Sequence, residues 1–316
     1  MPQPEREALL YRRDCGRREY LTRAFLWHVK RVVAARAKKH IADARKQLVV
    51  FSFDYVANNI NFDGVYERDA LDSFFDWLRT LGVDTRHAAA IDIGANIGNH
   101  SLYFSDHFEN VYSFEPNPRT YQVLRLNAEL AKNVHCWQIG LSDRNGSAAM
   151  RIPPHNIGGA SIGDKWEHSA QSIEVRTLDS LLPDVEKVRL IKVDVEGHEY
   201  QAISGSRKLI KAHRPIILFE QHLVDFRDGR SPVISLLQEL GYENFAILKK
   251  YPRVAGGYRM NVLAAPFLRL LLGESVRIKL VNHIQPDFYS FIIALPEWFP
   301  IAGIRLKDRK ITPGLF

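Results

Sequence analysis

The chain has 316 residues, 46% of them hydrophobic and 25% charged, so it can bury a full core in one large domain and is not a disordered chain. Its formal net charge is +7. The two cysteines, Cys15 and Cys136, argue against a disulfide scaffold or a cysteine zinc site and favour a reducing, cytoplasmic compartment. No apolar run reaches the length of about 18 residues that predicts a membrane-spanning helix.

Residues 1–48 form a predicted basic helical extension in front of a main domain over residues 49–316. Between residues 12 and 46, twelve Lys and Arg residues face three acids. Leu21, Phe25 and Val32 recur at helical spacing, which favours a solvated helix packed on the domain by a narrow apolar stripe. A second interpretation is contact with an anionic membrane surface or with nucleic acid, with Phe25 and Trp27 inserting at an interface.

In the main domain, apolar runs that predict strands alternate with helical patterns. The expected strands lie at about 48–56, 88–94, 110–116, 133–143, 188–197, 214–222, 242–251 and 287–296. The expected helices lie at about 69–81, with Asp69 as N-cap, and at 98–108, 117–131, 177–183, 199–213 and 231–241. This order predicts right-handed crossovers and an α/β doubly wound, mostly parallel sheet covered on both faces.

Two sections depart from this alternation. Residues 146–176 read as loops and short extended pieces, in which 155–168 is the expected acceptor-side loop. At about 252–287 we expect an insert of one or two helices. The last strand, 287–296, is then expected as an antiparallel partner at the edge of the sheet.

The stretch "AAAIDIGANIGNHSLYF" (88–104) combines a strand, a flexible turn and a helix start. Gly94 and Gly98 let the backbone turn tightly and approach a ligand at the carboxyl end of the strand. The spacing of Gly94, Asn96 and Gly98 is not that of a dinucleotide-binding GxGxxG turn. Asp92 at the strand end would repel a pyrophosphate, whereas it suits a cation such as the amino and sulfonium groups of S-adenosylmethionine.

Two further acidic positions fit a nucleoside. Glu115 ends the next strand, 23 residues after Asp92, and can accept both hydroxyls of a ribose, which supports a ribose but does not select the cofactor. Ser142 and Asp143 follow another strand and can meet an adenine amino group, although "SD" alone is also a common turn.

These motifs together resemble the FkbM-type class I methyltransferases. The resemblance covers residues 64–222 and rests on "GVYERDALDSF", "AIDIGANIGNHSLYF", "VYSFEPNP", "IGLSDRNG", "LIKVDVEGHEYQAISG" and "IILFEQH". It implies a sheet of seven strands and the use of S-adenosyl-L-methionine to methylate a hydroxyl. By this likeness Asp92, Gly94, Asn96 and Gly98 form the cofactor loop, Glu115 holds ribose and Asp143 lies by adenine. Glu67 precedes the first strand and would cover the cofactor.

The strand ends in the second half carry the candidate catalytic residues. A hydroxyl is a poor nucleophile near neutral pH and needs a base or a cation to lose its proton. The candidates are Asp194, Glu196, His198, Glu220 and His222. Asp194 can instead serve only the cofactor, and His198 is the preferred general base. A divalent ion held by Asp194, Glu196 and His198 or Glu220 is an open alternative, although we assign no metal ligand.

The sequence therefore predicts an O-methyltransferase that acts on a sugar, a glycan precursor or another small metabolite. A nucleic-acid methyltransferase is the first alternative, disfavoured because no "NPPY"-like or "DPPY"-like motif occurs. A non-catalytic binding protein on the same fold is the second, and a nicotinamide-dependent oxidoreductase the third. The expected partner is a small-molecule or carbohydrate acceptor, with peripheral membrane contact through the basic helix and an undetermined oligomeric state.

Overall fold

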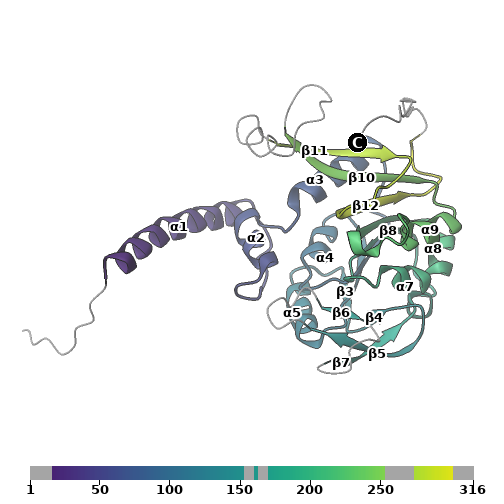
Figure 1. Cartoon of the computed structure of the whole chain (residues 1–316), viewed down its shortest axis with the longest axis horizontal. Helices are drawn as coiled ribbons and strands as arrows, with labels where there is room; N and C mark the ends of the chain where they lie inside the picture. The colour runs from purple at the N-terminus through teal and green to yellow at the C-terminus, as the bar shows by residue number, and fades with distance from the viewer. Residues whose placement is uncertain (1–15, 153–159, 163–169, 253–273, 302–316) are drawn as a thin grey trace, which may run out of the picture.

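The computed structural model describes residues 16–152, 160–162, 170–252 and 274–301, which form an α/β body with one projecting helix (Figure 1). The main sheet has the strand order β11-β10-β12-β9-β8-β1-β2-β3. Its strands are β1 (Ala89–Ile93), β2 (Asn110–Phe114), β3 (Val134–Trp137), β8 (Val188–Val193), β9 (Ile216–Gln221), β10 (Asn244–Pro252), β11 (Glu274–Val281) and β12 (Tyr289–Leu295). The helices are α1 (Arg17–Ala42), α2 (Tyr55–Asp63), α3 (Arg68–Thr80), α4 (Asn99–Phe104), α5 (Pro118–Ala128), α6 (Leu178–Leu181), α7 (Glu199–Ser204), α8 (Arg207–His213), the 3-10 turn η2 (Leu223–Asp225) and α9 (Pro232–Glu239).

The middle of the main sheet is parallel. β1 pairs in parallel with β2 and β8, β2 with β3, and β8 with β9. β12 runs antiparallel between β9 and β10, and β11 pairs antiparallel with β10. The predicted fold class is therefore confirmed. The sheet has eight strands rather than the expected seven because β11 extends it by one.

The central strands are buried on both faces, which explains why they read as continuous apolar runs. On β9, Ile217 and Phe219 pack in a cluster with buried residues of α7, α8 and α9. Ile216 and Leu218 point to the other face and belong to a cluster with α3 and α4. This alternation is the two-residue period of a strand between two layers of helices.

The C-terminal strands correct two predictions. The described end of the expected helical insert, residues 274–281, is strand β11, in which Val276, Ile278 and Leu280 alternate with polar residues. Residues 253–273 of the insert lie outside the described residues. β12 is antiparallel as predicted, yet it lies inside the sheet because β10 and β11 follow it toward the edge.

Three predicted elements differ in their boundaries. The expected strand at 48–56 is not formed; α2 begins at Tyr55, and Asp54 caps it by accepting hydrogen bonds from the amides of Val56 and Ala57. The helix expected from Asp69 begins one residue earlier, with Glu67 at the N-cap. The helix expected at 199–213 is divided into α7 and α8.

A separate small sheet accounts for much of the section between residues 140 and 176. Its strands are β4 (Gly140–Leu141), β5 (Gly146–Arg151), β6 (Ser161–Ile162) and β7 (Gln171–Arg176), in the order β4-β7-β5-β6. Met150, Ile173 and Val175 form its own apolar cluster. The expected acceptor-side loop at 155–168 lies outside the described residues except for 160–162.

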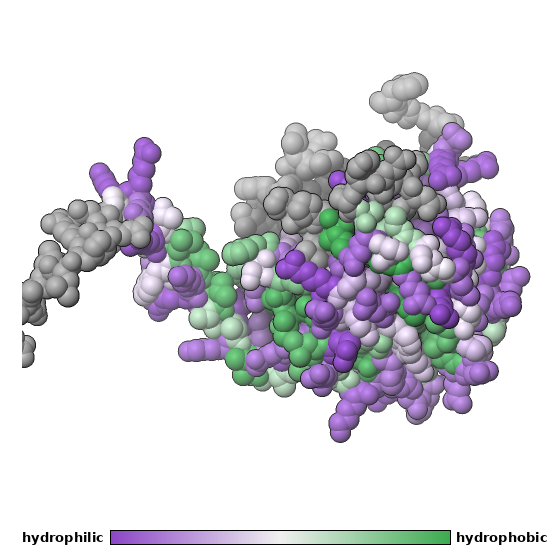
Figure 2. All heavy atoms as spheres, turned by 90° about the horizontal axis from the view of Figure 1, so that it is seen from below, coloured by the Kyte–Doolittle hydropathy of each residue, from purple (hydrophilic) through white to green (hydrophobic). Residues whose placement is uncertain are grey.

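The basic extension forms α1, which projects from the body (Figures 1 and 2). The predicted helix is present, but the expected packing of its apolar stripe on the domain is wrong, because no residue of α1 is buried. Near its end, a ring nitrogen of His40 lies 3.0 Å from the carbonyl oxygen of Phe62 in α2. None of the helices in the described ranges combines the length and the hydrophobicity needed to cross a membrane.

Candidate active site

A cavity of about 500 Å³ opens at the carboxyl ends of β1, β2 and β8. Parallel α/β sheets bind their ligands at this edge, where crossovers diverge to opposite faces. Its wall consists mainly of residues 53–56, 93–97, 114–116, 139–141 and 194–196, together with Tyr66, Asn99, His100, Thr120, Met150, Ala160, Ile162, Lys192 and Glu220. The cavity therefore gathers most of the motifs that the sequence singled out.

The turn after β1 lines this cavity as predicted. Gly94 has φ +75°, and a Cβ atom on it would overlap the carbonyl oxygen of Asp194. Asn96 has φ +50°, a left-handed conformation that asparagine tolerates better than most residues. The tight turn therefore brings bare backbone to the cavity wall, which is what close approach of a ligand requires.

Glu115 lies at the end of β2, on the opposite side of the turn, and is 7% exposed. Its carboxylate accepts hydrogen bonds from the backbone amides of Asn96 (3.0 Å) and Asn117 (2.9 Å). Burial raises the pKa of Glu115 to about 7, against the lowering effect of these amides. Each carboxylate oxygen retains a further lone pair, so Glu115 can accept two hydroxyl protons from a ligand.

Asp92 lies beneath the cavity rather than in its wall, contrary to the expectation that it receives the ligand's amino group. It is fully buried. Ser101 Oγ donates to Asp92 Oδ2 at 2.6 Å, and Lys192 Nζ lies 3.2 Å from Asp92 Oδ1. The charge of Asp92 is thus balanced from inside the protein.

Lys192 connects Asp92 to the cavity. Its Nζ donates to the carbonyl oxygen of Gly94 at 2.9 Å and lies 3.2 Å from Asp194 Oδ2. Burial opposes the charged ammonium, but Asp194 and Asp92 more than offset it and raise the pKa of Lys192. In turn, although burial of the Asp194 carboxylate acts to raise its pKa, Lys192 lowers that pKa. Asp194 therefore presents a negative charge to the cavity, in the place expected of Asp92.

The predicted adenine contacts are not at the cavity wall. Ser142 is buried, and its hydroxyl pairs with His198. Asp143 is exposed on the far side of the strand end, 3.8 Å from Arg144. The wall at this end is instead formed by Ile139, Gly140, Leu141, Met150 and Ile162. These apolar side chains come partly from the small sheet and suit a flat heterocycle.

Gly98 and Glu67 support the cavity from outside it. Gly98 has φ +90° and begins α4, and a Cβ atom there would lie 2.8 Å from Leu124 Cδ1 of α5. Glu67 Oε2 lies 3.2 Å from His100 Nε2, and His100 lines the cavity. Gly98 and Glu67, which the resemblance assigns to the cofactor site, thus contact elements that line the cavity.

The turn after β8 carries three acids with different environments. Asp194 and Glu196 line the cavity, and Glu196 has φ +52°. Burial, followed by the charge of Asp194, raises the pKa of Glu196. Glu199 points inward and accepts from the amides of Val195 (3.1 Å) and Gly197 (3.2 Å), so it closes the turn and takes no part in the wall.

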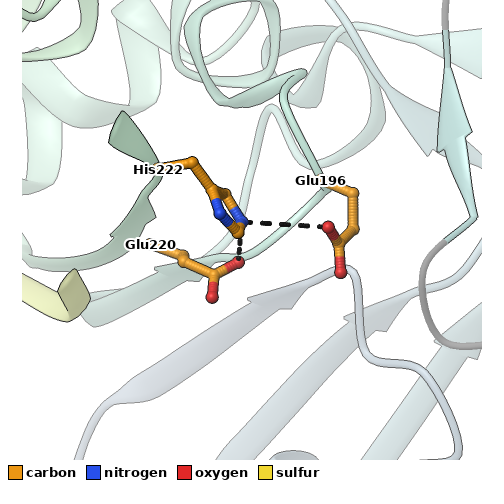
Figure 3. A group of neighbouring side chains, drawn as sticks. All are labelled: Glu196, Glu220 and His222. Atoms are coloured by element: carbon orange, nitrogen blue, oxygen red, sulfur yellow. Dashed lines mark hydrogen bonds and ion pairs between the residues drawn. The ribbon is translucent and has the colours of Figure 1, made fainter. Parts of the chain in front are cut away.

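Glu220 and His222 come from β9 and the residues after it, beside this turn. Figure 3 shows that Glu196, Glu220 and His222 point toward one another. His222 Nε2 lies 3.2 Å from Glu220 Oε2 and 3.9 Å from Glu196 Oε2. Burial, with the charges of Asp194 and Glu196, raises the pKa of Glu220 to about 9. The sequence suggests that two acids and two imidazoles converge here; the structure brings together Glu196, Glu220 and His222, without His198.

His198, the preferred base of the sequence prediction, lies elsewhere. Its Nε2 is 3.0 Å from Ser142 Oγ, it is 8% exposed, and it is absent from the cavity wall. The Gly197 turn directs it toward the start of the small sheet. The structure thus places His198 away from the cavity that Asp194 and Glu196 line.

A second cavity of about 1060 Å³ adjoins the first, and Tyr55, Tyr66 and Glu220 line both. Its other walls come from α1, α2, α3, β10 and β12, and include Arg36, Lys39, His40, Arg68, Lys249 and Lys250. A molecule in the second cavity would therefore meet one in the first at Tyr66 and Glu220.

The cavity residues that were not predicted include Lys192, Tyr66 and His100. Lys192 had a signal, since a single lysine within the apolar strand "LIKVDV" needs a buried acidic partner. Tyr66 and His100 lie within the quoted motifs "GVYERDALDSF" and "AIDIGANIGNHSLYF", but their places at the cavity depend on how α3 and α4 pack. Tyr66 is held by Asn99, whose side chain accepts from the Tyr66 amide (2.9 Å) and donates to its carbonyl (3.1 Å).

Comparison with known proteins gives the same family as the motifs. A hexuronic acid methyltransferase of Haloferax volcanii, AglP, is 32% identical over 153 residues, which cover 47% of this chain and 60% of AglP. A 2-O-methyltransferase of Sinorhizobium fredii, NoeI, is 26% identical over 53% of this chain and 76% of NoeI. A methyltransferase FkbM of Methylobacillus flagellatus has 19% identity and a TM-score of 0.32, over 58% of this chain and 48% of that one.

The family match lies in the region that forms most of the cavity wall. Residues 92–243 match the sequence profile of the methyltransferase FkbM domain, from the end of β1 to the start of β10. Residues 92–243 of this chain therefore match the FkbM methyltransferase domain, and the relatives named above are methyltransferases.

Proposed function

We propose that this protein transfers a methyl group from S-adenosylmethionine to a hydroxyl group of a carbohydrate. The observation that carries the proposal is that the bare Gly94 turn and Glu115, whose carboxylate accepts from the Asn96 amide of that turn, line one cavity at the carboxyl edge of the sheet. This arrangement offers close backbone approach and a ribose acceptor side by side, in a region that matches a methyltransferase domain.

The residues of the cavity fit the cofactor. Glu115 would accept the ribose hydroxyls, and the apolar wall at Ile139, Leu141 and Met150 would contact the adenine. Asp194, which lines the same cavity and carries a negative charge, would attract the cationic amino acid part. When bound, the cofactor supplies a methyl group on a sulfonium, which is already a good leaving group.

The acceptor hydroxyl would enter through the adjoining cavity. Tyr66 and Glu220 line both spaces, so a hydroxyl near them would face the first cavity. The protein's main contribution is to hold the two partners in line and to exclude water. Glu196, Glu220 and His222 surround the place where the hydroxyl proton must leave.

A carbohydrate is the acceptor class that the observations favour. The relatives AglP and NoeI are named for methylation of a hexuronic acid and for 2-O-methylation. The second cavity includes Arg36 and Lys39, cations that can bind an acidic sugar. Because the matched region spans 60% of AglP, this comparison supports a class of acceptor and not one compound.

The test is a transfer assay with methyl-labelled S-adenosylmethionine. The acceptors are a uronate-containing oligosaccharide pool, the same pool after carboxyl reduction, and bulk RNA. We expect label on a saccharide hydroxyl, with preference for the acidic pool. Label on RNA alone would contradict the proposal and support the nucleic-acid alternative. Binding of S-adenosylhomocysteine without transfer to any pool would refute the carbohydrate acceptor.

A further inference from the structure

Glu196, Glu220 and His222 offer three metal-ligand atoms at the end of the cofactor cavity where it meets the second cavity (Figure 3). Two are carboxylate oxygens and one is an imidazole nitrogen, and all lie within 4.8 Å of one another. Glu196 and Glu220 also line the cavity, so an ion held here would face a ligand inside it.

The spacing of these atoms fits a single cation. His222 Nε2 is 3.2 Å from Glu220 Oε2 and 3.9 Å from Glu196 Oε2. Ligand atoms about 2.1 Å from one ion are separated by about 3.0 to 4.2 Å, depending on the angle between them. The three atoms therefore need only small side-chain movements to share an ion.

The backbone presents these ligands from two neighbouring strands. Glu220 lies in β9 and His222 directly after it, while Glu196 comes from the turn after β8, which pairs with β9. The side chains of Glu220, His222 and Glu196 are 18%, 35% and 37% exposed, respectively. An ion and its remaining water ligands can therefore reach the group from solvent.

We propose that Glu196, Glu220 and His222 bind a divalent cation, of the magnesium or manganese kind, at the acceptor end of the cavity. Two carboxylates and one imidazole suit such an ion when water completes its shell. The set differs from the one left open by the sequence, because His198 pairs with Ser142 and because the three ligand atoms that lie close together are those of Glu196, Glu220 and His222.

The role of the cation rests on the proposed function. A hydroxyl that approaches the cation would become more acidic, and its proton would leave to solvent. The oxygen would then form a bond to the methyl carbon as the carbon–sulfur bond breaks, which gives an ether and a neutral thioether.

The experiment titrates Mn²⁺ into the chelator-treated full-length protein and follows the free ion by electron paramagnetic resonance. We expect one site per chain in the wild type. Glu196→Gln and His222→Gln should each weaken it at least tenfold. Glu239→Gln is the matched control and should leave binding unchanged. Glu239 is in α9, and its exposed carboxylate pairs with Arg207 of α8.

Equal Mn²⁺ binding by the wild type and both site variants would overturn the metal site, as would an absence of binding. Calorimetry with S-adenosylhomocysteine on the same samples separates this failure from failure of the proposed function. S-adenosylhomocysteine binding without Mn²⁺ binding would refute only the metal site. Mn²⁺ binding that the site variants abolish, without S-adenosylhomocysteine binding, would uphold the site and refute the cofactor assignment.

Discussion

Single residues determine whether the cavity can form, and Gly94 is the position with the least steric freedom. Its positive φ is unfavourable for any other residue, and an added Cβ atom would overlap the carbonyl oxygen of Asp194. The clash would push the turn after β8 away from the turn after β1. The residue that gives the cofactor loop its shape thus also sets the place of Asp194.

We expect Gly94→Ala to lower the free energy of unfolding by about 3 kcal/mol or more and to abolish binding of S-adenosylhomocysteine. Gly82→Ala is the control, since Gly82 also has a positive φ (+69°) but nothing lies within 4 Å of its added Cβ. Denaturant unfolding and calorimetry should show a loss of about 1 kcal/mol and normal affinity for Gly82→Ala. Equal behaviour of the two variants would refute the steric argument.

Glu115 should make cofactor affinity depend on pH. Its pKa is raised to about 7, so the folded protein binds a proton between about pH 4.5 and 7 that the unfolded chain releases. The contribution of Glu115 to the free energy of unfolding therefore falls as pH rises through that window, because the folded state must give up this proton. The carboxylate that accepts ribose hydroxyls forms over the same range, so affinity for S-adenosylhomocysteine should increase from pH 6 to 8.

Glu115→Gln should weaken S-adenosylhomocysteine binding about tenfold or more at pH 8, because hydrogen bonds to a charged acceptor are lost. It should also flatten the pH dependence, as measured by calorimetry from pH 6 to 8. Glu129→Gln, on the exposed end of α5, serves as the control and should keep the wild-type profile. A wild-type profile in Glu115→Gln would remove Glu115 from the ribose site.

Lys192 should stabilise the fold by balancing the buried charge of Asp92. Removing the ammonium leaves a fully buried carboxylate whose remaining neighbour is the Ser101 hydroxyl. We expect Lys192→Met to lower the free energy of unfolding by about 3 to 5 kcal/mol. Adding Asp92→Asn should recover part of this loss in urea unfolding. If the double variant is no more stable than Lys192→Met, the coupling of the two buried charges is wrong.

The residues of the site were predictable where a motif fixes them in one turn, as at Gly94, Asn96 and Glu115. The prediction was wrong where two candidates lie close in sequence and the backbone decides which faces the cavity. His198 and Asp194 are four residues apart, yet the Gly197 turn directs them to different places. Asp194 lines the cavity, whereas Asp92 lies beneath it, and Lys192 pairs with both carboxylates.

At the scale of elements, the parallel strands were predictable because buried strands read as apolar runs bounded by turns. β11 was missed because "FLRLLLGESVRIKLV" begins with a helical pattern, and its alternation starts only at Glu274. The break between α7 and α8 depends on a tertiary contact: a Cβ on Gly205 would overlap the Ser142 carbonyl oxygen. Contacts between distant segments leave little trace in a local pattern.

The projecting helix α1 exposes large apolar side chains among many cations. Tyr20, Leu21, Phe25 and Trp27 are each more than half exposed, and Arg31 lies over the Trp27 ring. Helices in proteins gain most of their stability from packing against other structure, and no residue of α1 is buried, so we expect α1 to have a partner. Aromatic and basic residues together suit an anionic lipid interface.

We therefore expect phosphatidylglycerol vesicles to shift the fluorescence of Trp27 to the blue, with weaker binding at high salt. The signal of Trp27 is the difference between the wild type and Trp27→Phe, since the chain has five tryptophans. Phosphatidylcholine vesicles are the control and should give no shift. A shift of the same size with both lipids, or with neither, would contradict an electrostatic lipid contact.

At the scale of the whole molecule, one cavity lies at the carboxyl edge of the parallel strands, and the other lies between the N-terminal helices and β10 and β12. The family match covers residues 92–243, which form most of the wall of the first cavity. α1, α2 and α3 precede this region, and they form much of the second cavity, together with β10 and β12. Acceptor choice should therefore reside largely outside the matched region.

The most direct test of the account is a crystal structure of the protein with S-adenosylhomocysteine. We predict that the ribose hydroxyls bind the Glu115 carboxylate, that the adenine lies against Ile139 and Leu141, and that the sulfur points toward Glu220. Density for the ligand elsewhere on the protein, or a ribose that does not contact Glu115, would contradict the central claim.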